Sequence, residues 1–323
     1  MSLLPKTAAV LGGGAVGQVL VPALNRAGMR VVLPWNRSEQ RGWQSDFEGI
    51  QAAELIFLTV SDGAVEEVCR RIAPLLRRGQ LVAHCAGTLG LAPLQPALDA
   101  GARTGSLHPL RAVPRGSPAA TLRDAAAGVA GSDAAARETL QQVARALGMS
   151  PVPVSDASRP LYHAAAVLAA GGEVALFARA VQAFQDATGA PEPLARAALL
   201  PLARGALEAL EHRSASEALT GPVPRGDAAT VQAHRAALDG ELLPLYDQLI
   251  RAMLALRPSA EIESLLRTRP AEEHPTAVPG SRSSPPRPRP PRAERPSASS
   301  RSPAPRARPT SPPRRGRAPR RKR

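Results

Sequence analysis

Residues 7–17, TAAVLGGGAVG, decide the fold class of this 323-residue chain. The apolar residues 7–11 predict a short buried strand, and a glycine-rich turn leads from them into a segment of helical spacing at residues 16–27. Further strand-like runs alternate with helical segments, at residues 30–35, 55–60, 81–84, 104–107, 128–130 and 151–154. Strands that alternate with helices predict a doubly wound, mainly parallel α/β sheet.

The pattern changes after Ser155. Long Ala/Leu-rich segments follow one another at residues 160–188, 193–212 and 227–256, and turn-forming sequences separate them. No strand is expected among them. We therefore expect an α/β domain over residues 1–155, an all-α domain over residues 156–262, and a tail over residues 263–323.

The tail differs in composition from the rest of the chain. Between Ala271 and Arg323 lie 14 of the 34 prolines, no aromatic residue, and 15 Lys and Arg against 3 Asp and Glu. Such a segment is predicted to be disordered. Because the tail carries most of the net charge of +14, the remainder is close to neutral, which excludes a uniformly basic nucleic-acid-binding domain. Binding of the tail to nucleic acid is expected to be weak and non-specific at most, and compositional bias without any partner is the favoured alternative.

The glycine-rich turn matches the pattern G-x-G-x-x-G and stands after a predicted strand and before a predicted helix. Gly12 would permit the tight turn, Gly14 the close approach of a pyrophosphate, and Gly17 the packing of helix on strand. The amides of Ala15 and Val16 at the helix start would face the anion. The sequence therefore predicts a Rossmann-type dinucleotide site; a glycine-rich turn without a ligand is the alternative.

The end of the second strand bears on the choice of cofactor. NAD sites usually have Asp or Glu there, whereas this chain has Asn36-Arg37-Ser38. Arg37 can pair with a 2′-phosphate and Ser38 can donate a hydrogen bond, so NADP(H) is expected, unless Arg37 is a solvated turn residue. Val60 and Ser61, at the end of a third strand, are further candidates for cofactor binding. Ser61 and Asp62 could line the nicotinamide side or, as an equally favoured alternative, cap the next helix.

Reduction of a carbonyl or imine by a nicotinamide requires a positioned proton donor. Lysine is nearly excluded, since Lys6 and Lys322 are the only two. His84 and His108 stand at strand ends, where a doubly wound sheet exposes residues to its crevice, and His163 stands at the start of the first long helix. His108 and His163 are therefore our candidates for the proton donor.

Two arginines are candidates for holding an anionic substrate. Arg159 lies four residues before His163 and shares a helix face with it. Arg225 belongs to the sequence ALTGPVPRGD between two predicted helices, where it could bind a carboxylate or phosphate; the alternative is a plain connection with Asp227 as the N-cap. No close-spaced set of three metal ligands exists, so no metal is expected.

Two cysteines, Cys69 and Cys85, provide no disulfide framework and no zinc cluster, which fits a reduced, cytoplasmic location. No run of about 18 apolar residues is free of charges and glycines, so no membrane-spanning helix is expected.

Six motifs of this chain carry a family resemblance: GGGAVG, FLTVSDGAVEEV, AHCAG, SLHPL, YHAAA and ALTGPVPRGD. Together they resemble bacterial proteins with a Rossmann-like domain and a helical domain of unknown function, related to the pyrroline-5-carboxylate reductase, ketopantoate reductase and hydroxyacid dehydrogenase superfamily. The resemblance covers roughly residues 6–256. It implies an NADP-dependent oxidoreductase whose helical domain packs against a partner copy in a homodimer.

The chain departs from the pattern expected of this family at two places. Arg159 stands where a lysine is expected, and Gly171-Gly172 where an asparagine is expected. Arginine keeps the charge but removes an accessible proton donor.

Two functions therefore stay open, and with them whether the protein is an enzyme. One is a reductase or dehydrogenase acting on a small anionic substrate in a crevice between the domains. The other is a dinucleotide-binding regulatory or assembly protein without turnover.

Overall fold

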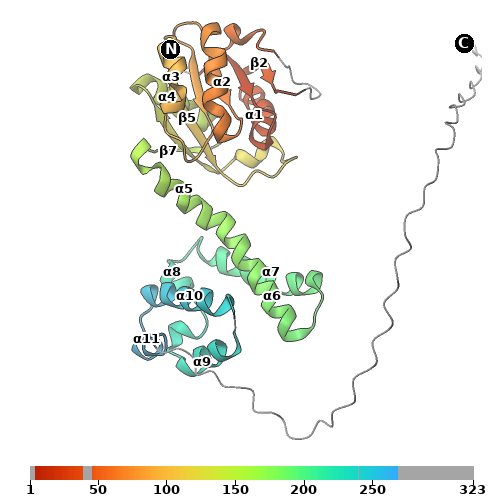
Figure 1. The fold of residues 1–323 in the computed structure, drawn as a ribbon, viewed down its shortest axis with the longest axis vertical. Helices are drawn as coiled ribbons and strands as arrows, with labels where there is room; N and C mark the ends of the chain where they lie inside the picture. Colours follow the sequence, from red (N-terminus) through yellow and green to blue (C-terminus); the bar gives the residue numbers. More distant parts are fainter. Residues whose placement is uncertain (1–3, 39–45, 239, 268–323) are drawn as a thin grey trace, which may run out of the picture. The chain divides into compact units, whose positions relative to one another are not determined.

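The computed structural model describes residues 4–38, 46–238 and 240–267, which all belong to one compact unit, Met1–Arg269. Most of the predicted tail lies outside these residues, so its disorder stays a prediction. The described part begins with an α/β region and continues into helices (Figure 1).

Seven strands form one sheet in the order β2-β1-β3-β4-β5-β6-β7. Strands β1 to β5 are parallel, β6 runs antiparallel to β5, and β7 is parallel to β6. The predicted mainly parallel α/β fold is thus confirmed. The strands are β1 (Thr7–Leu11), β2 (Arg30–Trp35), β3 (Leu55–Leu58), β4 (Leu81–His84), β5 (Arg103–Leu110), β6 (Ala126–Gly131) and β7 (Ser150–Pro153).

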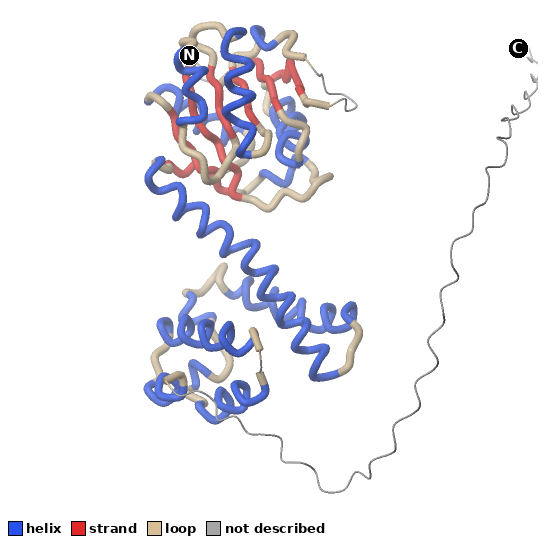
Figure 2. Tube along the Cα trace, viewed as in Figure 1, coloured by secondary structure: helices blue, strands red, loops and turns tan. Residues whose placement is uncertain are grey.

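Helices cover both faces of this sheet (Figure 2). Successive strand residues point to opposite faces, so Ala8 and Val10 join one apolar core while Ala9 and Leu11 join the other. Both faces of the strands are buried, as is typical of parallel sheets. Helices α1 (Ala15–Arg26) and α4 (Ala134–Ala146) pack on the first face, and α2 (Val65–Ile72) and α3 (Gln95–Asp99) on the second.

Short 3₁₀ turns connect several of these elements: η1 (Ile50–Ala52), η2 (Asp62–Ala64), η3 (Ala73–Leu75), η4 (Ala92–Leu94), η5 (Ala119–Leu122), η6 (Asp156–Ser158) and η8 (Val223–Arg225). The chain crosses from β2, on one side of β1, to β3 on the other side. This reversal opens a crevice at the carboxyl ends of β1 and β3, where the glycine-rich turn lies.

The described residues from 156 to 267 contain helices and no strand, as predicted. A π-helical turn, η7 (Leu168–Gly172), joins the first two helices into one continuous rod. The helices are α5 (Arg159–Val167), α6 (Glu173–Thr188), α7 (Glu192–Ala209), α8 (Ala215–Ala218), α9 (Ala228–Ala237), α10 (Leu242–Leu256) and α11 (Ala260–Leu265).

Two expectations about these helices were wrong. The segment predicted as one helix over residues 227–256 forms two, α9 and α10, and the break contains Gly240 with a φ of 50°. Glycine adopts this left-handed conformation without a Cβ clash, so the chain can turn there. In addition, α11 runs to Leu265 and Leu266 is buried, so the helical region extends past residue 262.

The rod formed by η6, α5, η7 and α6 is apolar and poorly covered. Although no membrane-spanning helix was expected, one helix among the described residues, Asp156–Thr188, is long and apolar enough to cross a membrane by length and composition alone, and very little of its most apolar stretch is buried. Leu168 and Val174 are 71% and 72% exposed. Patches of this kind on a folded protein indicate an interaction surface.

Candidate functional site

Steric constraints explain two of the three glycines that the pattern G-x-G-x-x-G requires. Gly12 has a φ of 129°, and a Cβ there would lie 2.6 Å from the carbonyl carbon of Thr59. A Cβ on Gly17 would lie 1.9 Å from the carbonyl oxygen of Gly12, so any larger residue would push α1 off the turn. Gly14 is the N-cap of α1, and the nearest atom to its Cβ position is 3.8 Å away. Space is therefore open at Gly14, where a pyrophosphate would approach.

Side chains from the neighbouring strands brace this turn. The backbone N–H of Gly13 donates to Oδ1 of Asn36 at 3.1 Å, and Nδ2 of Asn36 donates to the carbonyl of Ser38 at 3.0 Å. The Thr59 hydroxyl donates to the carbonyl of Gly12 at 2.8 Å. The ends of β2 and β3 are thereby fixed to the turn, with Asn36 as a positioning residue.

A cavity of about 360 Å³ lies at this turn. Of the predicted cofactor residues, Gly12, Gly14, Asn36, Arg37, Val60 and Ser61 line it, whereas Ala15, Val16, Gly17 and Ser38 do not. The Ser61 side chain makes no capping hydrogen bond, so the capping interpretation does not hold. The lining residues that sequence reasoning missed are Gly13, Trp35, Thr59, Ala64, Glu67, Val68, Arg71 and Arg115.

His108 and His163 lie close together, and we call them the histidine pair. Their ring centroids are 5.8 Å apart, with His108 on β5 and His163 on α5. Nδ1 of His108 is 3.0 Å from the hydroxyl of Tyr162, which precedes His163. A Cβ on Gly87 would lie 2.4 Å from Nδ1 of His163 and 3.0 Å from Nε2 of His108. The backbone after β4 therefore lies against the pair, and a side chain at position 87 would force the His163 ring to move.

The environment of His108 favours its neutral form. Burial and, to a smaller extent, the nearby charges of His163 and Arg159 together lower its pKa to about 4. Burial raises the pKa of Tyr162, so that its phenol keeps its proton. We therefore assign the phenol as donor to Nδ1 of His108, which leaves the ring proton on Nε2.

His163 has an unused polar atom. Its Nδ1 is buried and has no hydrogen-bond partner among the described residues. A buried polar group without a partner is costly, so a donor or acceptor from a bound molecule would be favourable at this nitrogen.

Arg159 was expected to hold a substrate, but its side chain is 0% exposed. Its Nη2 donates to the Ser106 hydroxyl on β5, and its Nε donates to Oδ1 of Asp156 at 3.3 Å. Oδ2 of Asp156 in turn accepts from the backbone N–H of Leu91 at 2.9 Å. These hydrogen bonds connect the start of α5 to β5 and to the segment after β4. Arg159 and Asp156 thereby fit the role of residues that position the histidine pair. Nη1 of Arg159 has no partner in the part of the chain that the structure describes.

His84 was expected to face the crevice, and this expectation was wrong. The side chain is fully buried, and burial lowers its pKa. Nε2 donates to the carbonyl of Gly90 at 3.0 Å, and Nδ1 accepts from the N–H of Ala86 at 3.2 Å. Both ring nitrogens are therefore used to hold the loop after β4.

Arg225 is exposed, while neighbouring Val223 is anchored in a separate apolar core of the helical region. Over the described residues, the structure gives Arg225 no contact with the histidine pair. Asp227 accepts from the N–H of Thr230 at 3.0 Å, so its interpretation as the N-cap of α9 is confirmed. Within the described ranges, no three His, Cys, Asp or Glu side chains are grouped to hold a metal ion.

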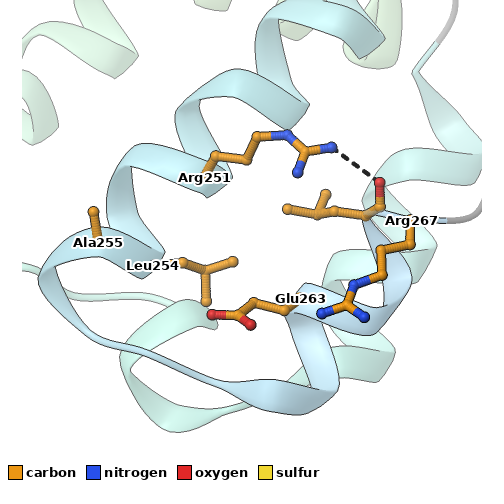
Figure 3. Close-up of a pocket in the computed structure, with 6 residues that line it drawn as sticks. Arg251, Leu254, Ala255, Glu263 and Arg267 are labelled. Carbon is orange, nitrogen blue, oxygen red and sulfur yellow. Dashed lines mark hydrogen bonds between the residues drawn. The ribbon is translucent and has the colours of Figure 1, made fainter.

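A further cavity, of about 420 Å³, lies in the helical region (Figure 3). The charged side chains around it, Arg251, Glu263 and Arg267, are all exposed, and Nη2 of Arg251 donates to the carbonyl of Leu266 at 3.0 Å. This cavity lacks the buried polar groups that distinguish the site beside the sheet.

Comparisons with solved structures support the fold. A protein from Bacteroides fragilis, provisionally assigned as an NADP oxidoreductase, is 20% identical with a TM-score of 0.63, covering 78% of this chain and 99% of that one. A pyrroline-5-carboxylate reductase from Coxiella burnetii is 21% identical with a TM-score of 0.51, covering 79% and 99%. The Plasmodium falciparum pyrroline carboxylate reductase with NADP bound is 12% identical with a TM-score of 0.52, covering 78% and 98%. No curated protein matches the chain.

Two protein families match successive parts of the sequence. The Rossmann-like domain matches residues 6–109, and the domain of unknown function DUF2520 matches residues 125–253. The second match begins within the seven-stranded sheet, before β6, and continues through α5 into α10. The chain therefore carries a Rossmann-like domain followed by a DUF2520 domain.

Proposed function

We propose that this protein is an NADP(H)-dependent oxidoreductase that transfers a hydride between the nicotinamide and a carbonyl or imine carbon of a small anionic substrate. The observation that carries the proposal is the placement of the glycine turn and the histidine pair at one edge of the sheet. Leu58 on β3 pairs with His84 on β4, so Val60 and Ser61 of the cavity neighbour the loop that contains Gly87. Gly87 in turn touches both histidines.

The described residues fit a dinucleotide. The open position at Gly14 suits a pyrophosphate, and Arg37 suits a 2′-phosphate. The bound nicotinamide would supply the hydride. The fold relationship to a reductase solved with NADP supports the same cofactor class.

The two histidines have different roles in this proposal. His108 is neutral at physiological pH because its pKa is about 4, so its Nε2–H polarises the substrate oxygen or nitrogen without transferring its proton. His163 donates the proton to the atom that gains charge as the hydride arrives at the neighbouring carbon. The buried guanidinium of Arg159 adds a positive field that favours an anionic substrate.

Turnover and cofactor affinity together test the proposal. With a panel of small oxo acids and cyclic imines, His163→Ala should lower kcat at least about a hundredfold, because general acid catalysis contributes about 10²–10⁴-fold. NADPH affinity should change less than about twofold, since the proton donor acts at the chemical step. His212→Ala, at an exposed histidine of the helical region, is the matched control.

Each alternative result has a defined meaning. Tight NADPH binding without turnover of any panel member would favour the dinucleotide-binding regulatory or assembly function. Loss of NADPH binding in His163→Ala, with kcat unchanged at saturation, would refute the assigned role of His163.

We also propose a homodimer in the cytoplasm, in which a second copy covers the apolar rod of α5, η7 and α6. The rod is poorly suited to a membrane because it is anchored to the sheet by buried Arg159 and carries Glu173, Arg179 and Asp186 on α6. Its exposed apolar side chains suit a protein interface.

Light scattering should therefore give twice the chain mass. Leu168→Asp should give a monomer, whereas Leu98→Asp, at a less exposed apolar position on α3 outside the rod, should leave the dimer intact. A monomeric wild-type protein, or recovery of the protein with lipid, would contradict the dimer.

A further inference from the structure

We propose that Arg71, held against the rings of Trp35 and Phe47, is a second residue that selects the 2′-phosphate of the cofactor. This inference rests on the proposed function, and it assigns the specificity of that site to a residue outside the strand-end sequence Asn36-Arg37-Ser38. Arg71 belongs to α2 and lines the cavity at the glycine turn together with Arg37.

The two aromatic rings form a support for the guanidinium. Cζ of Arg71 lies 5.6 Å from the ring centroid of Trp35 and 5.1 Å from that of Phe47. The two rings contact each other in a tilted arrangement, with centroids 4.9 Å apart and an interplanar angle of 30°. Both distances from Cζ are within the range of favourable cation–π contacts.

The support is rigid at its base. Trp35 is 2% exposed and packs in the apolar core beside Ile50, so its ring cannot move away. Arg71 itself is exposed, which leaves its N–H groups accessible from the cavity. An arginine stacked in this way has lost much of its rotamer freedom before a ligand arrives, so less entropy is lost when it pairs with a phosphate.

Charge in the cavity favours the same ligand. Among the described residues, the lining side chains include Arg37, Arg71 and Arg115 and one carboxylate, Glu67. The net charge of these side chains is positive and complements a phosphate monoester, which carries about −1.5 to −2 at pH 7. Arg71 on α2 lies over the ring of Trp35, and Trp35 stands two residues before Arg37 in the chain. The guanidinium groups of Arg71 and Arg37 can therefore bind the same phosphate, one from α2 and the other from the end of β2.

Glu67 supports an alternative, in which the cavity binds NAD(H) as well as NADP(H). It lies one helical turn before Arg71 on α2 and could accept hydrogen bonds from the ribose hydroxyls of NAD(H). In that case the cavity would not distinguish the two cofactors, and substitution of Arg71 would affect both alike.

The experiment compares the affinities of the full-length protein for NADPH, NADH and 2′,5′-ADP by titration calorimetry at one salt concentration. Arg71→Ala should weaken NADPH and 2′,5′-ADP about tenfold or more, the size expected for a charge-assisted hydrogen bond, and change NADH by less than about twofold. Phe47→Leu keeps the charge but removes one ring, so a smaller loss confined to the same two ligands is expected. Arg70→Ala is the matched control, because Arg70 pairs with Glu66 and does not line the cavity.

The outcomes separate this inference from the proposed function. If the wild-type protein binds neither NADPH nor NADH, the dinucleotide function itself is overturned. If NADPH binds and Arg71→Ala weakens NADPH and NADH equally, or weakens neither, the role of Arg71 is overturned while the dinucleotide site stands. Thermal unfolding of each variant identifies any general loss of folding.

Discussion

Acid should destabilise this protein through His108, and the effect has a defined pH window. The folded-state pKa of His108 is about 4, against an ordinary value of 6.5, because the ring is buried next to His163 and Arg159. Between these two pH values the unfolded state binds more protons than the folded state. The free energy of unfolding therefore decreases as the pH falls from about 6.5 to about 4 and is insensitive to His108 above that window.

The magnitude follows from the pKa difference. One pKa unit corresponds to about 1.4 kcal/mol, so the full difference would give about 3 kcal/mol. Because the ring keeps some contact with solvent, screening reduces the effect, and we expect about 2 kcal/mol. The Tyr162 hydroxyl also favours the neutral His108 ring, because it can donate a hydrogen bond to Nδ1 only while that nitrogen carries no proton.

Urea unfolding of the wild-type protein and of His108→Asn between pH 4 and pH 8 measures this effect. Asparagine retains a polar partner for Tyr162 but does not titrate, so the stability difference should vary with pH inside the window and be flat above it. NMR titration of the His108 ring gives the same pKa without a variant. A ring that titrates near 6.5, or a stability difference independent of pH, would refute the reasoning.

Three further substitutions test the architecture of the site. Gly17→Ala should abolish dinucleotide binding and lower the melting temperature, because its Cβ would lie 1.9 Å from the Gly12 carbonyl oxygen; unchanged calorimetric binding would contradict this. Asp156→Ala should lower the free energy of unfolding in urea by about 2 kcal/mol, since it removes a charge-assisted hydrogen bond from the buried Arg159 although Asp156 itself is half-exposed, and a loss below about 0.5 kcal/mol would contradict this role of Asp156. Asp227→Ala should cost about 1 kcal/mol as a lost N-cap, with cofactor affinity unaffected.

Local patterns predicted the α/β part of the fold well. The strand Thr7–Leu11, the glycine turn and α1 follow from hydrophobic spacing and glycine placement, which are properties of neighbouring residues. The division of residues 227–256 into α9 and α10 was missed because Gly240 lies within an otherwise helical composition. A single glycine is tolerated in many helices, so its role depended on the packing around it.

The site was predictable where its residues stand on sequence motifs and less so elsewhere. His108 and His163 were identified from their places at a strand end and a helix start, and the structure brings them together. Arg71 was missed, because its stacking on Trp35 requires the β2–α2 packing that no local pattern contains. Arg159 was assigned to the substrate on the strength of its charge, whereas burial directs its guanidinium to Ser106 and Asp156.

A crystal structure of the protein with NADPH tests the central claim most directly. We predict that the pyrophosphate binds at Gly14, that the 2′-phosphate lies between Arg37 and Arg71, and that C4 of the nicotinamide faces the gap between His108 and His163. A nicotinamide that faces away from the histidine pair, or a glycine turn that stays empty at saturating NADPH, would contradict the account.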